Sequence, residues 1–273
     1  DKNHQQFSSD AIFGGIMIDD DIVGDPNGDF FVKSFITMDP PEHGPQRKAV
    51  SKIAAPASLS SFEGLIRERT QTLLDTLPVG EEFDWVDKVS IELTTMMLAT
   101  LFDFPYEDRH KLTRWSDVAT AEADSPIVGS QEQRIAELME CLAYFKKLKE
   151  ERRDGPANFD LITMLAQDSV TADQPDTHFL GNLMLLIVGG NDTTRNTMSA
   201  SINAFHQYPE QLDILRARPE LLDNMISEVV RWQTPLSHMR RTAMVDTHIG
   251  QQEIKKGDKI VMWYYSGNRD ESV

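Results

Sequence analysis

Hydrophobic residues recur at three- and four-residue steps along much of the chain, which is typical of helices that bury one face. Residues 62–77 carry such a stripe after a Ser60 to Glu63 spacing that matches a capping box at a helix start. Residues 85–102 continue as a mostly apolar helix that Pro105 ends. A third stripe of apolar side chains predicts another helix: Ile135, Leu138, Met139, Leu142 and Phe145.

The longest predicted helix covers residues 177–208 and would measure about 48 Å at 1.5 Å per residue, enough to cross a whole domain. Pro209 and Pro219 each stand where a new helix can begin, because proline is favoured in the first turn. They predict shorter helices over residues 210–217 and 220–233. Most of the chain is therefore predicted to be helical.

The pattern changes after Pro235, where short runs typical of strands replace the helical stripes. These runs predict strands over residues 239–245, 247–249, 253–254 and 259–265. We find no internal repeat and no low-complexity linker. The predicted fold class is mainly α with a small β region, and we expect residues 1–273 to be part of one domain.

The composition narrows the classes of protein to which this chain can belong. It has 273 residues with 27 Lys and Arg against 44 Asp and Glu, which gives a formal net charge of −17. This charge argues against unaided binding to nucleic acid or to an anionic membrane, because both repel an acidic surface. The longest uninterrupted apolar run, residues 183–188, is far shorter than the roughly 20 residues of a membrane span.

The single cysteine, Cys141, allows no internal disulfide and no cysteine-rich zinc site, which suits a reducing cytoplasm. No basic segment leads into an apolar stretch near residue 1, so we see no signal peptide. The chain begins without Met, and its last predicted strand is followed by only eight residues. We therefore expect an internal fragment of a longer cytoplasmic protein.

Residues 189–196, Gly-Gly-Asn-Asp-Thr-Thr-Arg-Asn, are unusual for the middle of a long helix. Each glycine in a helix interior costs about 1 kcal/mol relative to alanine, so the missing side chains should serve a purpose. A flat ligand lying against the helix is one explanation, and Asp192 and Thr193 would then form a proton-delivery pair beside it. A packing groove with a locally opened polar kink is the alternative.

Other motifs carry charged side chains that could act together. Glu228 and Arg231 stand one helical turn apart, which by itself indicates only a surface ion pair. A proline-rich entry begins a helix that places His43 and Arg47 on one face, where they could clamp a carboxylate. A solvated helix start explains the same two residues equally well. Arg241, in the first predicted strand, could likewise either bind a carboxylate or be a solvated surface residue.

Three consecutive aspartates, Asp19 to Asp21, raise the alternative of a metal-dependent helical synthase. The aspartate pattern of such an enzyme needs a further carboxylate four residues after the first, with an intervening pair that this chain lacks. Neighbouring glycines and Pro26 instead favour a solvated loop.

Taken in order and at these separations, the motifs resemble those of the cytochrome P-450 family of haem-thiolate monooxygenases, over essentially the whole chain. Residues 39–47 are similar to the C helix of that family, and Gly-Gly-Asn-Asp-Thr-Thr is similar to its oxygen-activating I-helix motif. Glu-Val-Val-Arg matches its Glu-x-x-Arg, Arg241-Thr242-Ala243 its haem-reaching strand, and residues 266–270 the stretch before its cysteine loop. The resemblance implies the cytochrome P-450 fold and haem b as cofactor.

The resemblance also implies roles for individual residues. Five would bind the cofactor, through its carboxylates or by letting the porphyrin approach: His43, Arg47, Arg241, Gly189 and Gly190. Asp192 and Thr193 would be catalytic, delivering protons during oxygen activation. Glu228 and Arg231 would be structural.

The iron ligand of the family is a cysteine thiolate in a glycine-containing loop, and that loop would lie beyond Val273. Cys141 lies in the middle of a predicted helix beside Leu138 and Phe145, so we interpret it as a small buried hydrophobe. No metal ligand is therefore assigned within the chain, and the fragment itself is expected to be inactive.

Finer similarities, in residues 180–196 and 232–241, resemble the soluble bacterial subfamily of alkane terminal hydroxylases. They imply hydroxylation of the terminal methyl of medium-chain n-alkanes or related aliphatics, with O2 and electrons from a [2Fe-2S] ferredoxin and its reductase. An alkane has no polar group to hold, so a narrow apolar tube would have to select the methyl end. The candidate walls of that tube are Leu185, Val188, Leu236 and Met239.

Two questions of partner and class stay open at this point. Lys48 and Lys52, one turn beyond Arg47, could offer a basic patch to an acidic ferredoxin despite the net charge. The rival class is a protein that binds haem or another apolar ligand without redox activity. The polar pair Asp192 and Thr193 in an apolar groove argues against that rival, and a downstream cysteine would exclude it.

Overall fold

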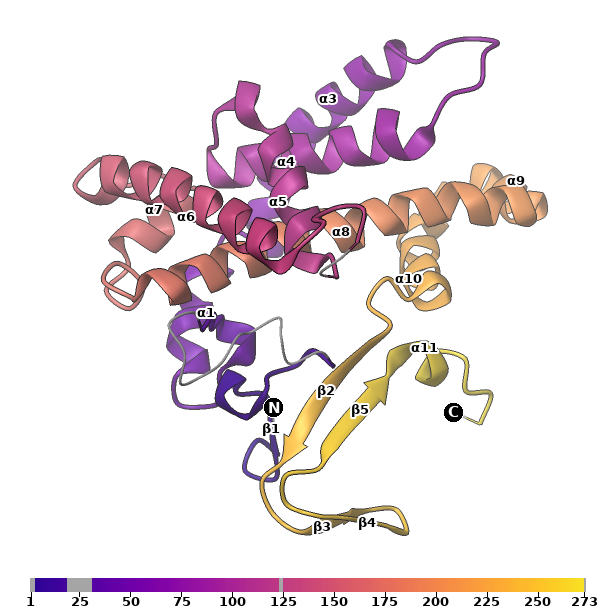
Figure 1. Cartoon of the computed structure of the whole chain (residues 1–273). Coiled ribbons are helices and arrows are strands. Elements are labelled where there is room, and N and C mark those ends of the chain that lie inside the picture. The colour runs from indigo at the N-terminus through magenta and orange to yellow at the C-terminus, as the bar shows by residue number, and fades with distance from the viewer. Residues whose placement is uncertain (1–2, 19–30, 123–124, 273) are drawn as a thin grey trace.

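The long helix α8 (Asp176–Gln207) crosses the helical part of the molecule, and the other elements are arranged around it (Figure 1). The structure is a computed structural model that describes residues 3–18, 31–122 and 125–272. The predicted helix over residues 177–208 is confirmed to within one residue at each end. The predicted fold class, mainly α with a small β region, is also confirmed.

The remaining helices precede and follow α8 along the chain. The α-helices are α1 (His43–Ser51), α2 (Pro56–Ser61), α3 (Glu63–Asp75), α4 (Glu92–Phe102), α5 (His110–Thr120), α6 (Gln131–Arg153), α7 (Leu161–Gln167), α9 (Pro209–Ala217), α10 (Leu222–Gln233) and α11 (Tyr264–Gly267). A π-helix, η4 (Val86–Ile91), leads into α4, and 3-10 turns include η3 (Phe35–Thr37) and η6 (Pro219–Leu221).

The main hydrophobic core lies where α4, α5 and α6 pack against α8, and α7 adds to it by packing on α6. Trp115, Phe102 and Phe145 are fully buried there, and burying one such side chain contributes about 1.5–3 kcal/mol. Helix α6 begins at Ser130, whose side chain accepts a hydrogen bond from the backbone N–H of Gln133. The core thus buries one face of α8, and the opposite face of that helix does not pack against these helices.

The strands form one three-stranded antiparallel sheet and one small hairpin. Strands β1 (Phe7–Ser8), β2 (His238–Ala243) and β5 (Lys259–Trp263) pair in the order β1-β2-β5, and β3 (Thr247–Ile249) pairs with β4 (Gln252–Ile254). Because β1 pairs with β2, the beginning of the chain lies beside the C-terminal strands (Figure 1).

Three local predictions were wrong. Ser60 does not cap a helix at Glu63, because it lies inside α2 and its hydroxyl donates to the Pro56 carbonyl. Met139 is exposed, whereas Leu138, Cys141, Leu142 and Phe145 form the buried face of α6. The last strand ends at Trp263, and Tyr264 and Tyr265 begin α11. The Asp19 to Asp21 run lies outside the described residues.

Within the described part of the chain, no helix combines the length and the apolar character needed to cross a bilayer. The same residues contain no cluster of three or more His, Cys, Asp or Glu side chains arranged to hold a metal ion.

Candidate functional site

Helix α8 has a packed face and an open face in its middle. Leu180, Leu183 and Ile187 are fully buried against the neighbouring helices. Leu185 and Val188 are only partly buried, and Gly189 is exposed. These last three positions follow three- and four-residue steps and therefore share one side of the helix. The open side carries two of the four predicted tube residues.

The two adjacent glycines lie on different sides of α8. A side chain at Gly190 would bring its Cβ within 2.6 Å of Leu98 Cδ2, so this glycine lets α8 approach α4 closely. A Cβ at Gly189 would meet no atom within 4 Å. Helix packing, which was the alternative to a bound ligand, therefore explains Gly190. Of the two glycines, Gly189 is the one that faces free space.

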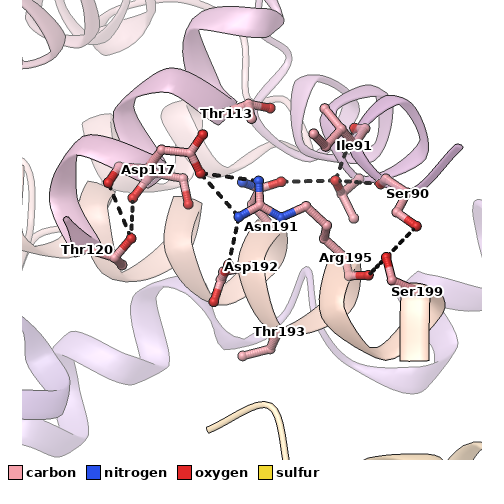
Figure 2. A network of polar contacts seen from close by, with 12 residues as sticks. Ser90, Ile91, Thr113, Asp117, Thr120, Asn191, Asp192, Thr193, Arg195 and Ser199 are labelled. Carbon is pink, nitrogen blue, oxygen red and sulfur yellow. Dashed lines mark hydrogen bonds and ion pairs between the residues drawn. The ribbon is translucent and has the colours of Figure 1, made fainter. Parts of the chain in front are cut away.

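Thr193 lies one turn after Gly189, and Figure 2 shows it on the opposite side of α8 from Asn191. Its hydroxyl donates to the Gly189 carbonyl at 3.0 Å and leaves the oxygen lone pairs available as acceptors. The hydroxyl is thus held close to the open face, next to the position where the helix lacks a side chain.

Asp192 is engaged by Arg195, a residue to which the sequence pattern assigned no role. Arg195 Nη2 donates to Asp192 Oδ1 at 2.8 Å, and both terminal nitrogens of Arg195 bond Asp117 Oδ1 on α5, at 3.2 and 3.1 Å (Figure 2). The three-residue spacing from Asp192 to Arg195 is a readable ion-pair signal. Asp117 has no such signal, because it is 78 residues away in sequence.

Two more polar contacts fix the register of α8 on its packed face. Asn191 is fully buried, and its Oδ1 accepts from the Thr94 hydroxyl of α4 at 2.9 Å. Ser199 Oγ donates to Ser90 Oγ in η4 at 2.9 Å. Because buried polar groups need partners, these contacts allow only one rotation of the helix about its axis. That rotation directs Gly189 and Thr193 to the open side.

Helix α1 carries the predicted donors His43 and Arg47. His43 Nδ1 lies 2.7 Å from the Phe35 carbonyl oxygen, and since a carbonyl only accepts, Nδ1 is the protonated nitrogen. Nε2 is left on the other side of the ring. Arg47 is exposed. Both α1 and the β2–β5 strands lie below α8 in the view of Figure 1.

Adjacent arginines in β2 have different surroundings. Arg240 is fully buried and donates to the carbonyls of Ile18 and Gly14. Successive strand residues point to opposite faces, so Arg241 lies on the other face of the sheet. There it is partly exposed, and its Nη1 donates to the Arg240 carbonyl at 2.7 Å. Arg240 therefore attaches the N-terminal segment to β2, whereas Arg241 lies on the opposite face of the sheet.

Glu228 and Arg231 on α10 form a two-point ion pair. Arg231 Nε and Nη2 donate to the two carboxylate oxygens of Glu228 at 2.7 and 2.6 Å, and Arg231 Nη1 donates to the Asn268 carbonyl at 2.6 Å. Hydrogen bonding from Arg231 holds the pKa of Glu228 below its usual value. The pair thus joins α10 to the segment after α11.

The other predicted residues divide by their exposure. Met239 in β2 is partly buried, and Leu236 before it is exposed. Cys141 is fully buried in α6, where burial raises the pKa of its thiol well above the usual value. Such a thiol is inert, because the thiolate is the form that binds metals.

The chain matches the cytochrome P-450 family over residues 19–273. It is 44% identical over 241 residues to linalool 8-monooxygenase from Pseudomonas putida, covering 88% of this chain and 59% of that protein. It is 35% identical over 240 residues to steroid C26-monooxygenase from Mycolicibacterium smegmatis, covering 87% of this chain and 55% of that protein. The chain therefore spans less than two thirds of each relative.

Solved structures give the same result. The chain superposes on cytochrome P-450-153 from Novosphingobium aromaticivorans with a TM-score of 0.86 and 42% identity, covering 99% of this chain and 67% of that one. It superposes on CYP153D17 from Sphingomonas sp. PAMC 26605 with a TM-score of 0.87 and 46% identity, covering 98% and 66%. Motifs, fold and similar proteins agree, and the chain belongs to the cytochrome P-450 family.

Proposed function

We propose that the complete protein is a haem-dependent monooxygenase that hydroxylates an apolar substrate, the terminal methyl of medium-chain n-alkanes or related aliphatics. The open face of α8 carries this proposal, because it combines the unfilled space at Gly189, the Thr193 hydroxyl and the apolar side chains Leu185 and Val188. The similarity to proteins of the 153 type supports it.

The residues of the chain fit a bound haem. A planar, largely apolar macrocycle needs an unobstructed helix face, and Gly189 leaves one. Its carboxylates need cationic donors, which His43, Arg47 and Arg241 supply from α1 and β2. Cys141 is the one cysteine and is enclosed in the core, so a thiolate ligand would come from outside these 273 residues.

Haem, when bound, supplies the iron at which dioxygen is reduced and a C–H bond is oxidised. The chain supplies proton transfer and shape. Thr193 Oγ1 can accept a proton on a lone pair and pass on the proton that it donates to the Gly189 carbonyl, since a hydroxyl can turn about its C–O bond. Asp192 is partly exposed and can exchange protons with solvent once it separates from Arg195. In this proposal Asp192 would take up protons from solvent, and the Thr193 hydroxyl would present them on the open face.

The first experiment measures both cofactor and product. The full-length protein is reduced under carbon monoxide to record its spectrum, and is then supplied with octane, linalool or a steroid together with O2 and reductant. A thiolate-type spectrum with terminal alcohol from octane is expected. A haem spectrum without any product would support the rival, a binding protein, whereas product from linalool or the steroid alone would reject the alkane assignment.

Gly189→Ala should separate folding from cofactor binding. The new methyl group meets no neighbour, so helix propensity should stabilise the haem-free protein by up to about 1 kcal/mol. The same methyl group would occupy the face proposed for haem, and the haem content of the purified full-length protein should fall severalfold. Unchanged haem content would remove Gly189 from the cofactor site.

Leu236→Phe tests the proposed substrate tube. Leu236 lies two residues before β2 with its side chain exposed, so the larger ring can be accommodated without unfolding the protein. A narrower tube should shift the preferred alkane to shorter chains and change the ratio of terminal to internal alcohols. Unchanged chain-length preference and product ratio would exclude Leu236 as a wall.

We propose a ferredoxin as electron donor, docked near the exposed lysines Lys48 and Lys52 at the end of α1. Opposite charges accelerate encounter, so Lys48→Glu with Lys52→Glu should slow reduction by about three- to tenfold at low salt. The matched control is charge reversal of Lys147 and Lys111, on α6 and α5. If the control slows reduction equally, or the salt dependence is unchanged, this docking site is wrong.

A further inference from the structure

Asn182 joins α8 to three separate stretches of the chain. It is buried, with 1% of its surface exposed. Its Oδ1 accepts from the Phe35 backbone N–H in η3 at 2.9 Å. Its Nδ2 donates to Gln46 Oε1 on α1 at 3.2 Å and to Gln174 Oε1 at 3.1 Å. One buried amide therefore connects α8 to the helix that carries His43 and Arg47.

Phe35 extends this connection to His43. The Phe35 N–H is used by Asn182, and the Phe35 carbonyl accepts from His43 Nδ1 at 2.7 Å. The two rings also meet edge to face, with centroids 6.4 Å apart and an interplanar angle of 64°. The position of Phe35 thus determines both the tilt of the imidazole and which of its nitrogens carries the proton.

The stretch before α1 is held at two further points. A Cβ at Gly181 would lie 2.5 Å from the Lys33 carbonyl oxygen, so this glycine lets the backbone touch α8. The Lys33 ammonium pairs with Asp10 at 3.1 Å and with Glu42 at 3.0 Å. Residues 33–43 are therefore held in place. A shift of Phe35 caused by a substitution at Asn182 should reach His43, because the backbone between them is not a mobile loop.

We propose that Asn182 is a positioning residue for the haem carboxylate site: through Phe35 it holds His43 in the Nδ1–H form with Nε2 directed to the ligand. This inference rests on the proposed function, which assigns His43 to a haem carboxylate. With the Nδ1 proton held on the Phe35 carbonyl, Nε2 is the ring atom left to face the ligand, and it donates to a carboxylate when it also carries a proton.

The test is the rate of haem loss from the full-length, haem-loaded protein to an excess of haem-free globin. Asn182→Ala and His43→Phe should each accelerate the loss about tenfold or more, the size expected for one lost hydrogen bond to a charged group. If Asn182 acts through His43, the double variant should lose haem no faster than His43→Phe alone. Multiplying effects would overturn the proposal.

Asn191→Ala is the matched control, because Asn191 is another buried asparagine of α8 but contacts Thr94 instead. It should lower the melting temperature to a similar extent, and its effect on haem loss should multiply with that of His43→Phe. Equal non-additivity in the control would show that general loosening of α8, and not the Phe35 connection, explains the result.

A second measurement does not depend on haem. Nitrogen-15 NMR of labelled histidines in the haem-free protein should show His43 as the Nδ1–H tautomer, and Asn182→Ala should mix the tautomers. An unchanged tautomer in Asn182→Ala would overturn this inference. A full-length protein that binds no haem would instead reject the proposed function, so the two failures can be told apart. If Asn182→Ala does not fold, Asn182→Asp keeps the acceptor for Phe35 and should stay within about twofold of wild-type haem loss. Loss as fast as in His43→Phe would contradict the inference.

Discussion

Thr193→Ala in the haem-loaded, full-length protein is expected to lower the product formed per electron pair by about tenfold, with the missing electrons recovered as peroxide. Thr193 presents its hydroxyl beside the open face of α8, bonded only one turn back to the Gly189 carbonyl. Alanine removes the group that transfers a proton but is a better helix former than threonine. Haem content and the melting temperature should therefore be preserved.

Thr194→Ala is the matched control, because Thr194 is the next residue of the same helix and is exposed. The measurement is a joint balance of reductant consumed, alcohol formed and peroxide released. Wild-type coupling in Thr193→Ala would refute the role of Thr193. An equal loss of coupling in both variants would attribute the effect to the helix and not to the hydroxyl.

Gly181→Ala should destabilise the protein by about 2 kcal/mol or more, the largest effect on stability among the α8 glycines. The new Cβ would lie 2.5 Å from the Lys33 carbonyl oxygen and 2.7 Å from its carbon. Both are backbone atoms, so relief requires moving the whole stretch that carries Phe35 away from α8. Urea unfolding of the full-length protein measures the loss.

The other glycines of α8 serve as controls for this series. Gly190→Ala meets the end of the Leu98 side chain, which can rotate, so the cost should be about 1 kcal/mol. Gly189→Ala meets open space and should not destabilise. The expected order of stability is Gly189→Ala, then Gly190→Ala, then Gly181→Ala. A Gly181→Ala variant as stable as the wild type would mean that α8 does not contact Lys33 as described.

Most elements of the fold could be predicted because their signals are local. Apolar spacing and flanking prolines located α8, α9 and α10, and turn residues separated the short strands. The errors arose where a local signal had two solutions. The stripe on α6 could include Met139 or Cys141, and packing selected Cys141. Ser60 matched a cap position, but the chain was already helical from Pro56.

The candidate site could be predicted in part for the same reason. The order of the motifs indicated the family, and Glu228 with Arg231 forms the expected pair. The engagement of Asp192 by Arg195 and Asp117 could not be predicted, because α5 and α8 meet only after folding. Asn182 was equally hidden, since its partner Phe35 lies 147 residues away.

The order of the motifs indicated the family by resemblance. The long helix could be predicted from the sequence because backbone propensity and periodicity act over a few neighbouring residues. Only the packing of the folded chain shows that Gly190 lies against Leu98 while Gly189 faces open space, and that Arg240 is buried while Arg241 is partly exposed. Two adjacent glycines, or two adjacent arginines, have the same local preferences. Their side-chain positions point to different faces of the helix or strand, so the elements packed on each face determine their different surroundings.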